Sequence, residues 1–364
     1  MSFHKKALYT DMTQNYLTPV EPMSHTRVKV RFRTGRGNVD RVTICYNGQK
    51  AIMRKDSFDD MFDYYAYHIR LTDEPIYYHF EVEAEDESCY YNRLGISKSE
   101  EARYDFILVP GFATPDWAKG AVVYQIYVDR FYNGDSSNDV VNDEYFYQGR
   151  PVKHAGHWND SVSRTDEGTF YGGDLQGIID KMDYLEGLGV EVLYLNPIFV
   201  SPSSHKYDIQ DYRHIDPHFG KIVNREECGL KDGYEQYRGI TTDRENLEAS
   251  DRLFARLVEE AHKRGMKVIL DGVFYCCGSW HRFMDKEGIY ANGDTCSIKG
   301  AYQDSNSPYR EYFQYKNPQD ANSYENWWGY EAYAKFNYEN SRKLYEYILS
   351  VAVKWVSKPF CADG

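Results

Sequence analysis

The sequence has little that would place it in a membrane or on a nucleic acid. Its apolar runs are only as long as strands, whereas a bilayer-spanning helix needs about 20 apolar residues. The first residues, MSFHKKALYTDMTQ, contain no apolar core, so no secretory signal peptide is expected there. The net charge of −13 argues against phosphate-rich partners, which are bound by clustered Lys and Arg. We therefore expect neither a nucleic-acid partner nor a membrane partner.

Cysteine-pairing signals are also absent. The chain of 364 residues has seven cysteines, an odd number, and no CxxC motif. This pattern favours free thiols in a reducing compartment, and we expect a cytoplasmic protein. Internal repeats and low-complexity tracts are lacking as well.

Tyrosine, in contrast, is abundant, with 35 residues, and aromatic residues make up 16% of the chain. Aromatic faces stack on the C–H faces of sugar rings, and phenol hydroxyls bond sugar hydroxyls. Tyrosine also fills half-exposed strand positions. Composition alone favours the second explanation.

The first part of the chain alternates apolar and polar residues with period two, between turn-forming spacers. This pattern predicts an antiparallel β-sandwich over residues 1–115. The strands expected from it are 27–32, 41–46, 64–71 and 76–83. The Pro- and Gly-containing loop FATPDWAKG, at 112–120, marks the domain boundary.

After this boundary, buried strands alternate with amphipathic helices, which predicts a parallel sheet or barrel. The expected strands are 122–128, 190–195 and 267–273, with a fourth beginning at Phe360. The expected helices are 175–188, one around 253–261 that Gly265 ends, and 341–356. Residues 116–273 and 336–364 thus predict the first three to four units of a (β/α)8 TIM barrel. Residues 274–335 form an excursion after the third strand.

Polar residues follow the second predicted barrel strand, at the end where active sites of barrels lie. Those able to touch a ligand are Asn196, His205, Tyr207, Asp208 and Asp216.

Several sequence words, in order along the chain, resemble glycoside hydrolase family 13, the α-amylase family. They are GAVVYQIYVDRFYNGD, YGGDLQGI, HKYDIQDY, IDPHFG, LDGV and KFNYEN. The first of them, at 120–135, and KFNYEN, at 335–340, resemble the neopullulanase, cyclomaltodextrinase and maltogenic-amylase group. The β-domain that ends in TPDWAKG looks like that group's N-terminal starch-binding module.

This resemblance implies a Ca²⁺ site. The residues that match it are Asn133, Asp135, Asn138, Asp139, Gly172 and Asp174. Carboxylate, amide and carbonyl oxygens are the ligands that Ca²⁺ prefers. The alternative is that NGDSSND is an Asx-rich turn and that Asp174 only caps a helix.

The resemblance also implies a sugar pocket. Tyr207 matches the tyrosine that stacks on the sugar at the cleavage position, and His205 and Asp208 match its neighbours. Asp271 matches an aspartate that holds the arginine beside the nucleophile. Alternatively, Tyr207 is a surface tyrosine and Asp271 caps a turn. Trp327 and Trp328 could be sugar platforms, and packing in the core is an equally good explanation of them.

One departure from the family lies after the third strand, where DGVFYCCG stands in place of D-x-V-x-Asn-His. Tyr275 and Cys276 occupy the Asn and His positions and are included among the substrate-binding candidates. Loss of the histidine's hydrogen bond would slow turnover by about 10²-fold. Engineering, a degenerate paralogue and a different substrate all explain the change.

The second departure is at the end of the chain, at Phe360–Gly364. In the family, this A-D-G begins the fourth strand, and the nucleophilic Asp and the acid/base Glu come later. We therefore assign no catalytic residue to the chain and expect it to be an inactive N-terminal part of a larger enzyme, since a retaining glycosidase needs two carboxyl groups about 5 Å apart.

The sequence thus predicts the N-terminal part of a retaining α-glucan hydrolase acting on cyclodextrin, pullulan or maltooligosaccharides. A non-catalytic glucan-binding pseudoenzyme and a glucan-transferring enzyme of the same family remain alternatives. A homodimer through the N-terminal module is implied by the resemblance alone.

Overall fold

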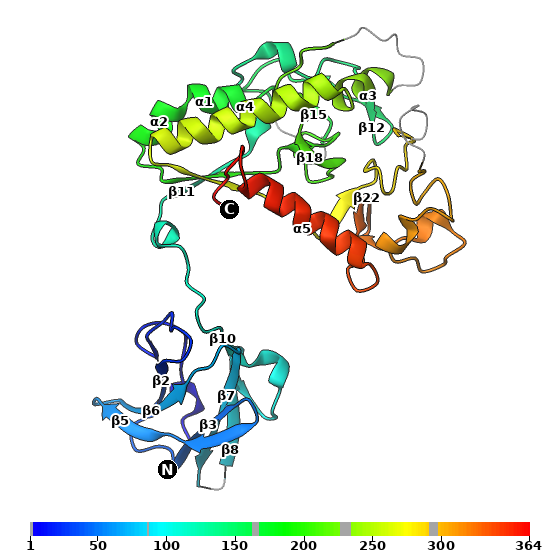
Figure 1. The fold of residues 1–364 in the computed structure, drawn as a ribbon. Coiled ribbons are helices and arrows are strands. Elements are labelled where there is room, and N and C mark those ends of the chain that lie inside the picture. Colours follow the sequence, from blue (N-terminus) through cyan, green and yellow to red (C-terminus); the bar gives the residue numbers. More distant parts are fainter. Residues whose placement is uncertain (1–2, 86, 162–166, 226–233, 291–297) are drawn as a thin grey trace. The chain divides into compact units, whose positions relative to one another are not determined.

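The structure is a computed structural model that describes residues 3–85, 87–161, 167–225, 234–290 and 298–364. The chain forms two compact units, Met1–Gly120 and Ala121–Gly364 (Figure 1). The boundary falls after Gly120, where the sequence suggested 115. No helix among these residues is long and apolar enough to cross a membrane.

The first unit is a sandwich of two antiparallel sheets. One sheet has the order β1-β2-β6-β5, and the other has the order β4-β3-β7-β8-β9, with β10 paired to β7. The strands are β1 (Leu17–Thr18), β2 (Arg27–Gly35), β3 (Arg41–Tyr46), β4 (Gln49–Ile52), β5 (Arg54–Phe58), β6 (Phe62–Arg70), β7 (Ile76–Ala84), β8 (Glu87–Asn92), β9 (Gly95–Ser97) and β10 (Phe106–Leu108).

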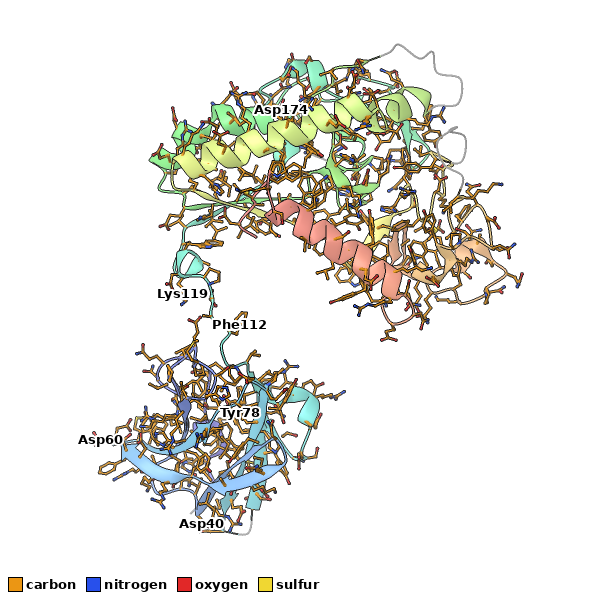
Figure 2. All side chains as sticks on the ribbon, viewed as in Figure 1. Asp40, Asp60, Tyr78, Phe112, Lys119 and Asp174 are labelled. Atoms are coloured by element: carbon orange, nitrogen blue, oxygen red, sulfur yellow. The ribbon has the colours of Figure 1, made fainter. Side chains whose placement is uncertain are left out.

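The core of this unit follows from the alternation in its strands. Every second residue of β2, starting at Val28, is buried, because successive side chains point to opposite faces. Phe32 of β2 meets Phe80 of β7 with ring centroids 4.6 Å apart, so the two sheets share one core. Tyr78 lies in the same core (Figure 2). Its ring stacks on that of Phe106, with centroids 5.2 Å apart. The predicted β-sandwich is confirmed.

The second unit is built on a parallel sheet with the order β11-β16-β19. The strands are β11 (Val123–Ile126), β16 (Val192–Leu195) and β19 (Lys267–Leu270). Its helices are α1 (Leu175–Asp180), α2 (Met182–Gly187), α3 (Glu235–Thr241), α4 (Arg244–Lys263) and α5 (Arg342–Val356). This is the start of a (β/α) barrel, as predicted.

The helices begin and end where local chemistry requires it. The Asp243 side chain accepts a bond from the Asn246 amide and caps α4, which lies beside α1 (Figure 1). Gly265, with φ +74°, follows the end of α4. The single helix predicted over 175–188 is wrong in one respect. It is divided at Lys181, whose φ of −100° and ψ of 8° leave the helical range.

The loops of this unit contain short strands. They are β12 (Phe146–Tyr147), β13 (Arg150–Pro151), β14 (Lys153–His154), β15 (Thr169–Phe170), β17 (Phe199–Val200), β18 (Asp211–Ile215), β20 (Cys276–Gly278), β21 (Asn326–Trp327) and β22 (Tyr330–Lys335). The excursion after β19 carries the antiparallel sheet β20-β22-β21. Single 3₁₀ turns lie at Lys5–Ala7, Ala102–Tyr104, Asp116–Ala118, Val128–Arg130, Ser136–Asn138, Arg310–Tyr312 and Ala321–Ser323.

The expectation of a fourth strand beginning at Phe360 is wrong for the described residues 357–364, which form no strand. Phe360 lies in a turn after α5, because the chain must reverse before it can return to the sheet. Only Asp363 and Gly364 bond β19: the Asp363 amide donates to Val268 O at 2.8 Å, and the Leu270 amide donates to Gly364 O at 2.9 Å.

Candidate functional site

Two side chains meet at the carboxyl end of the parallel sheet. Asp271 directly follows β19, and its amide donates to Leu195 O, at the end of β16, at 3.0 Å. The Tyr207 hydroxyl donates a hydrogen bond of 2.9 Å to Asp271 Oδ2. Burial and this carboxylate both raise the pKa of the Tyr207 phenol, which stays a neutral donor. The loop that follows β16 is thus hydrogen-bonded to the residue that follows β19.

His205 lies beside this pair and is held on both sides of its ring. Its Nδ1 accepts from the Tyr207 amide at 3.0 Å and lies 3.0 Å from Ser203 Oγ. Its Nε2 lies 3.3 Å from the Tyr333 hydroxyl and 3.7 Å from Glu167 Oε2. His205 also holds the pKa of Glu167 below its usual range, against the effect of burial.

Asp208 differs from its neighbours because its carboxylate points into the protein. The residue is 3% exposed, and its Oδ1 accepts hydrogen bonds from the hydroxyls of Ser201, at 2.6 Å, and Ser203. The structure therefore shows Asp208 anchoring the loop that carries His205 and Tyr207.

The resemblance places Tyr275 and Cys276 at the positions of an Asn and a His of the family. Tyr275 is partly exposed, and its ring centroid lies 5.6 Å from that of Trp327. Cys276 begins β20 and is fully buried, and burial raises the pKa of its thiol to about 12. A neutral, buried thiol cannot replace a histidine that donates to a sugar. All five cysteines in the described ranges are free, and Cys228 and Cys296 lie outside those ranges.

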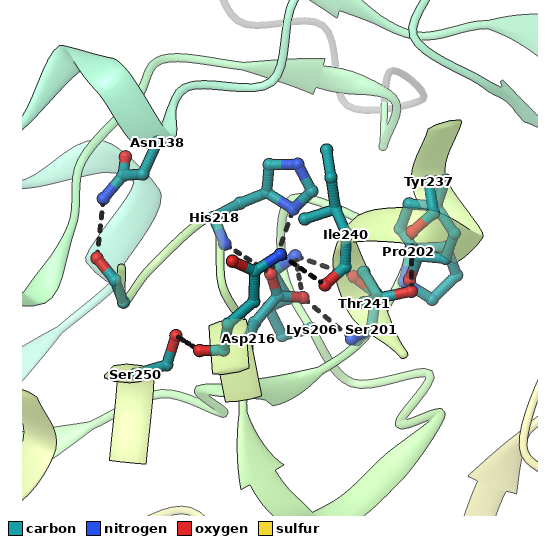
Figure 3. A network of polar contacts seen from close by, with 12 residues as sticks. Asn138, Ser201, Pro202, Lys206, Asp216, His218, Tyr237, Ile240, Thr241 and Ser250 are labelled. Carbon is teal, nitrogen blue, oxygen red and sulfur yellow. Dashed lines mark hydrogen bonds and ion pairs between the residues drawn. The ribbon is translucent and has the colours of Figure 1, made fainter. Parts of the chain in front are cut away.

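A buried charge network lies beneath the loop (Figure 3). Lys206 Nζ lies 2.7 Å from Asp216 Oδ2 and donates to Ser201 O at 2.7 Å. Asp216 also lies 3.2 Å from His218 Nδ1, and His218 Nε2 lies 2.8 Å from Glu144 Oε1. Asp216, a candidate for ligand contact from sequence, is 0% exposed, so that expectation is wrong. Asp216 anchors Lys206, which lies between His205 and Tyr207 in the sequence. The Lys206 backbone is left-handed, with φ of +61°.

The residues proposed for calcium form two neighbouring groups. In the first, Asn133 Nδ2 lies 2.8 and 3.0 Å from the two oxygens of Asp139. A Cβ on Gly172 would lie 2.5 Å from the same amide nitrogen, so only glycine leaves room there. Burial raises the pKa of the Asp139 carboxyl, and the hydrogen bond from Asn133 and the nearby His154 only partly oppose this effect.

The second group surrounds Asp174, which caps α1. Its carboxylate accepts bonds from the amides of Asp135, at 2.8 Å, and Gly177, at 2.6 Å, and from Asn138 Nδ2 at 3.2 Å. Asn138 Oδ1 is buried without a hydrogen-bond partner. The Asp135 carboxylate instead faces Lys221 and Ser137. Within the described ranges, no group of three His, Cys, Asp or Glu side chains is spaced to hold a metal ion.

A pocket of about 520 Å³ is lined in part by Glu167 and Tyr333, the two residues that face His205 Nε2. Its lining includes Tyr147, Glu167, Trp280, Tyr330 and Tyr333. Sequence reasoning missed Glu167 and Tyr333, since both are remote in sequence from the loop that they contact. The abundance of tyrosine in the chain was a signal for Tyr333, whereas no sequence signal pointed to Glu167.

Comparison with known proteins agrees with this geometry. Residues 125–228 and 237–357 match the family described as alpha amylase, catalytic domain, and residues 1–109 match alpha amylase, N-terminal ig-like domain.

Individual relatives point to the same group. A cyclomaltodextrinase of Geobacillus thermopakistaniensis is 30% identical over 99% of this chain and 55% of its own length. Neopullulanase 2 of Thermoactinomyces vulgaris is 34% identical over 71% of this chain and 39% of its own length. An amylopullulanase of Thermoanaerobacter thermohydrosulfuricus is 39% identical over 60% of this chain and 14% of its own length.

Among solved structures, the type III pullulan hydrolase from Thermococcus kodakarensis is 25% identical, with a TM-score of 0.57, over 98% of this chain and 55% of that one. The chain thus spans about half the length, or less, of these relatives. It belongs to the α-amylase family, glycoside hydrolase family 13, in the group of the neopullulanases, cyclomaltodextrinases and maltogenic amylases.

Proposed function

We propose that this chain supplies one wall of the sugar site of an enzyme that hydrolyses α-glucans such as cyclodextrin, pullulan or maltooligosaccharides. The observation that carries the proposal is the Tyr207–Asp271 hydrogen bond with His205 beside it, at the carboxyl end of the sheet. A fixed aromatic ring can stack on a sugar while the imidazole bonds its hydroxyls. The printed names of the relatives, pullulan hydrolase and cyclomaltodextrinase, support this substrate class.

Calorimetric titration with maltotriose tests the proposal. The chain is expected to bind the trisaccharide, and Tyr207→Ala is expected to weaken binding about tenfold through loss of the stacking face. Tyr184→Ala is the matched control, because Tyr184 is 54% exposed on α2. Equal affinities of the Tyr207 variant and the wild type would contradict the proposal.

The chain by itself is expected to bind without cleaving, since it spans only about half the length, or less, of its relatives and no catalytic residue is assigned within it. Maltose release by pure 364-residue chain would contradict this. The buried Cys276 thiol keeps a second function open, that of a non-catalytic glucan binder. Sugar binding with no turnover in the longest natural form of the protein would favour it, and transfer products would instead favour a glucan-transferring enzyme.

We further propose that Ca²⁺ binds between Asn133, Asp139 and the Gly172 backbone, with Asn138 and Asp174 adjacent. The buried, unpartnered Asn138 Oδ1 and the close packing of Gly172 against Asn133 and Asp139 support this choice of a hard cation. Thermal unfolding should shift upward with Ca²⁺ and not with the same ionic strength of Na⁺. An identical melting temperature in both salts would contradict it. A homodimer through residues 1–115 stays a prediction for sedimentation measurements.

A further inference from the structure

A second pocket lies between α1 and α4, and its lining is positively charged. Its volume is about 390 Å³, and its walls come from α1, from the loop after β18 and from one face of α4. The two helices lie side by side (Figure 1). None of the described residues that line this pocket belongs to the candidate sugar site or to the pocket lined by Glu167 and Tyr333. The second pocket is therefore separate from the site at Tyr207 and His205.

Two arginines of α4 form one side of this pocket. Arg252 and Arg256 are four residues apart, so their side chains leave the helix on the same face. Ala249 and Leu253 lie on that face as well and also line the pocket. Ala249 is buried and Leu253 is partly buried, so the floor beneath the two guanidinium groups is apolar.

Lys221 brings a third cation from the loop that follows β18. Its backbone is fixed against α4, because its amide donates to Ser250 Oγ at 3.0 Å, and Ser250 Oγ lies 3.2 Å from Lys221 O. The preceding Gly220 packs so closely that a Cβ there would lie 2.3 Å from Ser250 Cβ. Backbone contacts with α4 thus set the position of Lys221 relative to the two arginines.

The two guanidinium groups have donors left for a ligand. Arg252 Nη1 lies 3.9 Å from Glu248 Oε2, which is too long for a hydrogen bond, and Glu248 Oε1 lies 2.7 Å from Arg244 Nε. Arg256 forms no ion pair within the described ranges. In the described part of the chain, therefore, neither pocket arginine is hydrogen-bonded to a carboxylate.

The charge of the lining favours an anion. Asp135 is the one acidic residue among the described residues of the lining, and it pairs with Lys221. Three cationic side chains and one carboxylate leave a formal charge of +2, in a chain whose net charge is −13. Salt screens such charges only beyond about 8–10 Å, so an anion inside the pocket feels the whole surplus.

The donor geometry favours a phosphate group among anions. An arginine presents its N–H groups as a planar fork that binds two phosphate oxygens at once, and a lysine adds a point charge. The volume of about 390 Å³ lies in the range of about 300–1,000 Å³ that is typical of pockets for small organic molecules. The apolar floor at Ala249 and Leu253 suits a carbon skeleton next to the phosphate.

We propose that the pocket at Lys221, Arg252 and Arg256 binds a phosphate group, carried by a small sugar or free in solution. Lys221 is then shared between Asp135 and the phosphate. No glucan and no residue of the candidate sugar site take part in this binding, so the inference goes beyond the proposed function and does not depend on it.

Calorimetric titration of the full chain with inorganic phosphate and with glucose 6-phosphate tests the proposal, with NaCl at the same ionic strength as the reference. Arg252→Gln and Arg256→Gln are each expected to weaken binding about tenfold, through loss of hydrogen bonds to a charged group. Arg256→Lys keeps the charge but not the fork, and should recover only part of this loss. Both arginines are exposed, so all three variants should melt at the wild-type temperature.

Arg342→Gln is the matched control for these variants. It removes the same charge from an arginine that is 78% exposed on α5, outside the pocket. Its affinities for both probes should equal those of the wild type.

The outcomes decide between the two sources of phosphate and test the site itself. Glucose 6-phosphate that binds about tenfold more tightly than phosphate would assign the site to a phosphorylated sugar, and equal affinities would assign it to free phosphate. Wild-type affinity in Arg252→Gln and Arg256→Gln, or no heat beyond that of NaCl with either probe, would overturn the proposal. Displacement of glucose 6-phosphate by excess maltotriose would also overturn it, because the probe would then be bound at Tyr207. Failure of maltotriose to bind would remove the proposed function and leave this site standing.

Discussion

The Tyr207 hydroxyl donates a 2.9 Å hydrogen bond to Asp271 Oδ2, and this bond joins the loop after β16 to the end of β19. The polar side chains that follow β16 and β19 thereby lie next to each other at the carboxyl end of the sheet.

This bond should appear as a coupling energy between the two residues. In a double-mutant cycle of Tyr207→Phe and Asp271→Asn, urea unfolding should give a coupling of about 1–2 kcal/mol, as for a hydrogen bond to a carboxylate. Tyr184→Phe combined with Asp271→Asn should show none, because Tyr184 lies on the exposed side of α2. Additive effects in the first cycle would show that the bond contributes nothing.

The Lys206–Asp216 ion pair should be among the most sensitive positions of the second unit. Lys206→Met is expected to destabilise the fold by about 3–5 kcal/mol, because it leaves the fully buried Asp216 without its cation. Adding Asp216→Asn should recover part of this loss. Lys263→Met, at an exposed pair on α4, should leave the unfolding midpoint unchanged. A Lys206 variant as stable as this control would contradict the assigned role.

His218 should make stability fall on the alkaline side of neutrality. Burial lowers its pKa, but Glu144 and Asp216 outweigh burial and raise it above 6.5. A raised histidine pKa stabilises the fold fully below pH 6.5, and this stabilisation is lost as the pH rises through the folded-state value.

Asp216 behaves in the opposite way. Burial opposes its ionisation, yet Lys206 and His218 hold its pKa below 3.8, so its contribution is lost only in acid.

Urea unfolding from pH 4 to 9 tests the His218 prediction. The free energy of unfolding should decline above pH 6.5, and His218→Gln should abolish this decline. An unchanged decline in that variant would assign the effect to other groups.

Substitutions at Gly172 and Gly189 form a matched pair. Gly172→Ala places a Cβ 2.5 Å from Asn133 and 2.6 Å from Asp139, in a backbone of φ +80°. Gly189→Ala has nearly the same backbone, φ +74°, with nothing within 4 Å. The second change should cost about 1–2 kcal/mol through backbone conformation alone, and the first should cost more and also remove any Ca²⁺-dependent shift. Equal melting temperatures of the two variants would show that the Asn133–Asp139 group tolerates the extra atom.

The sequence predicted those parts of the fold whose signals are local. The apolar runs of β11, β16 and β19 and the helical periodicity of α4 and α5 are properties of consecutive residues, and each element lies where its pattern indicated. The division at Lys181 and the turn that replaces a strand at Phe360 were not predicted, because the backbone at those points adapts to its tertiary surroundings.

The site could be predicted only in part, for the same reason. Tyr207, His205 and Asp271 follow predicted strands, and the structure brings them together. Lys206 was missed because an ion pair buried beneath a loop has no sequence pattern. The partners of His205 come from elsewhere in the chain, Glu167 from an earlier loop and Tyr333 from the excursion, and only folding makes them neighbours.

The central claim is that an α-glucan binds at Tyr207 and His205. A crystal structure of the chain soaked with maltotriose tests it most directly. We predict a glucose ring stacked on Tyr207, with its hydroxyls within hydrogen-bond distance of His205 and Asp271. Sugar bound only within residues 1–120, with the Tyr207 face empty, would contradict it.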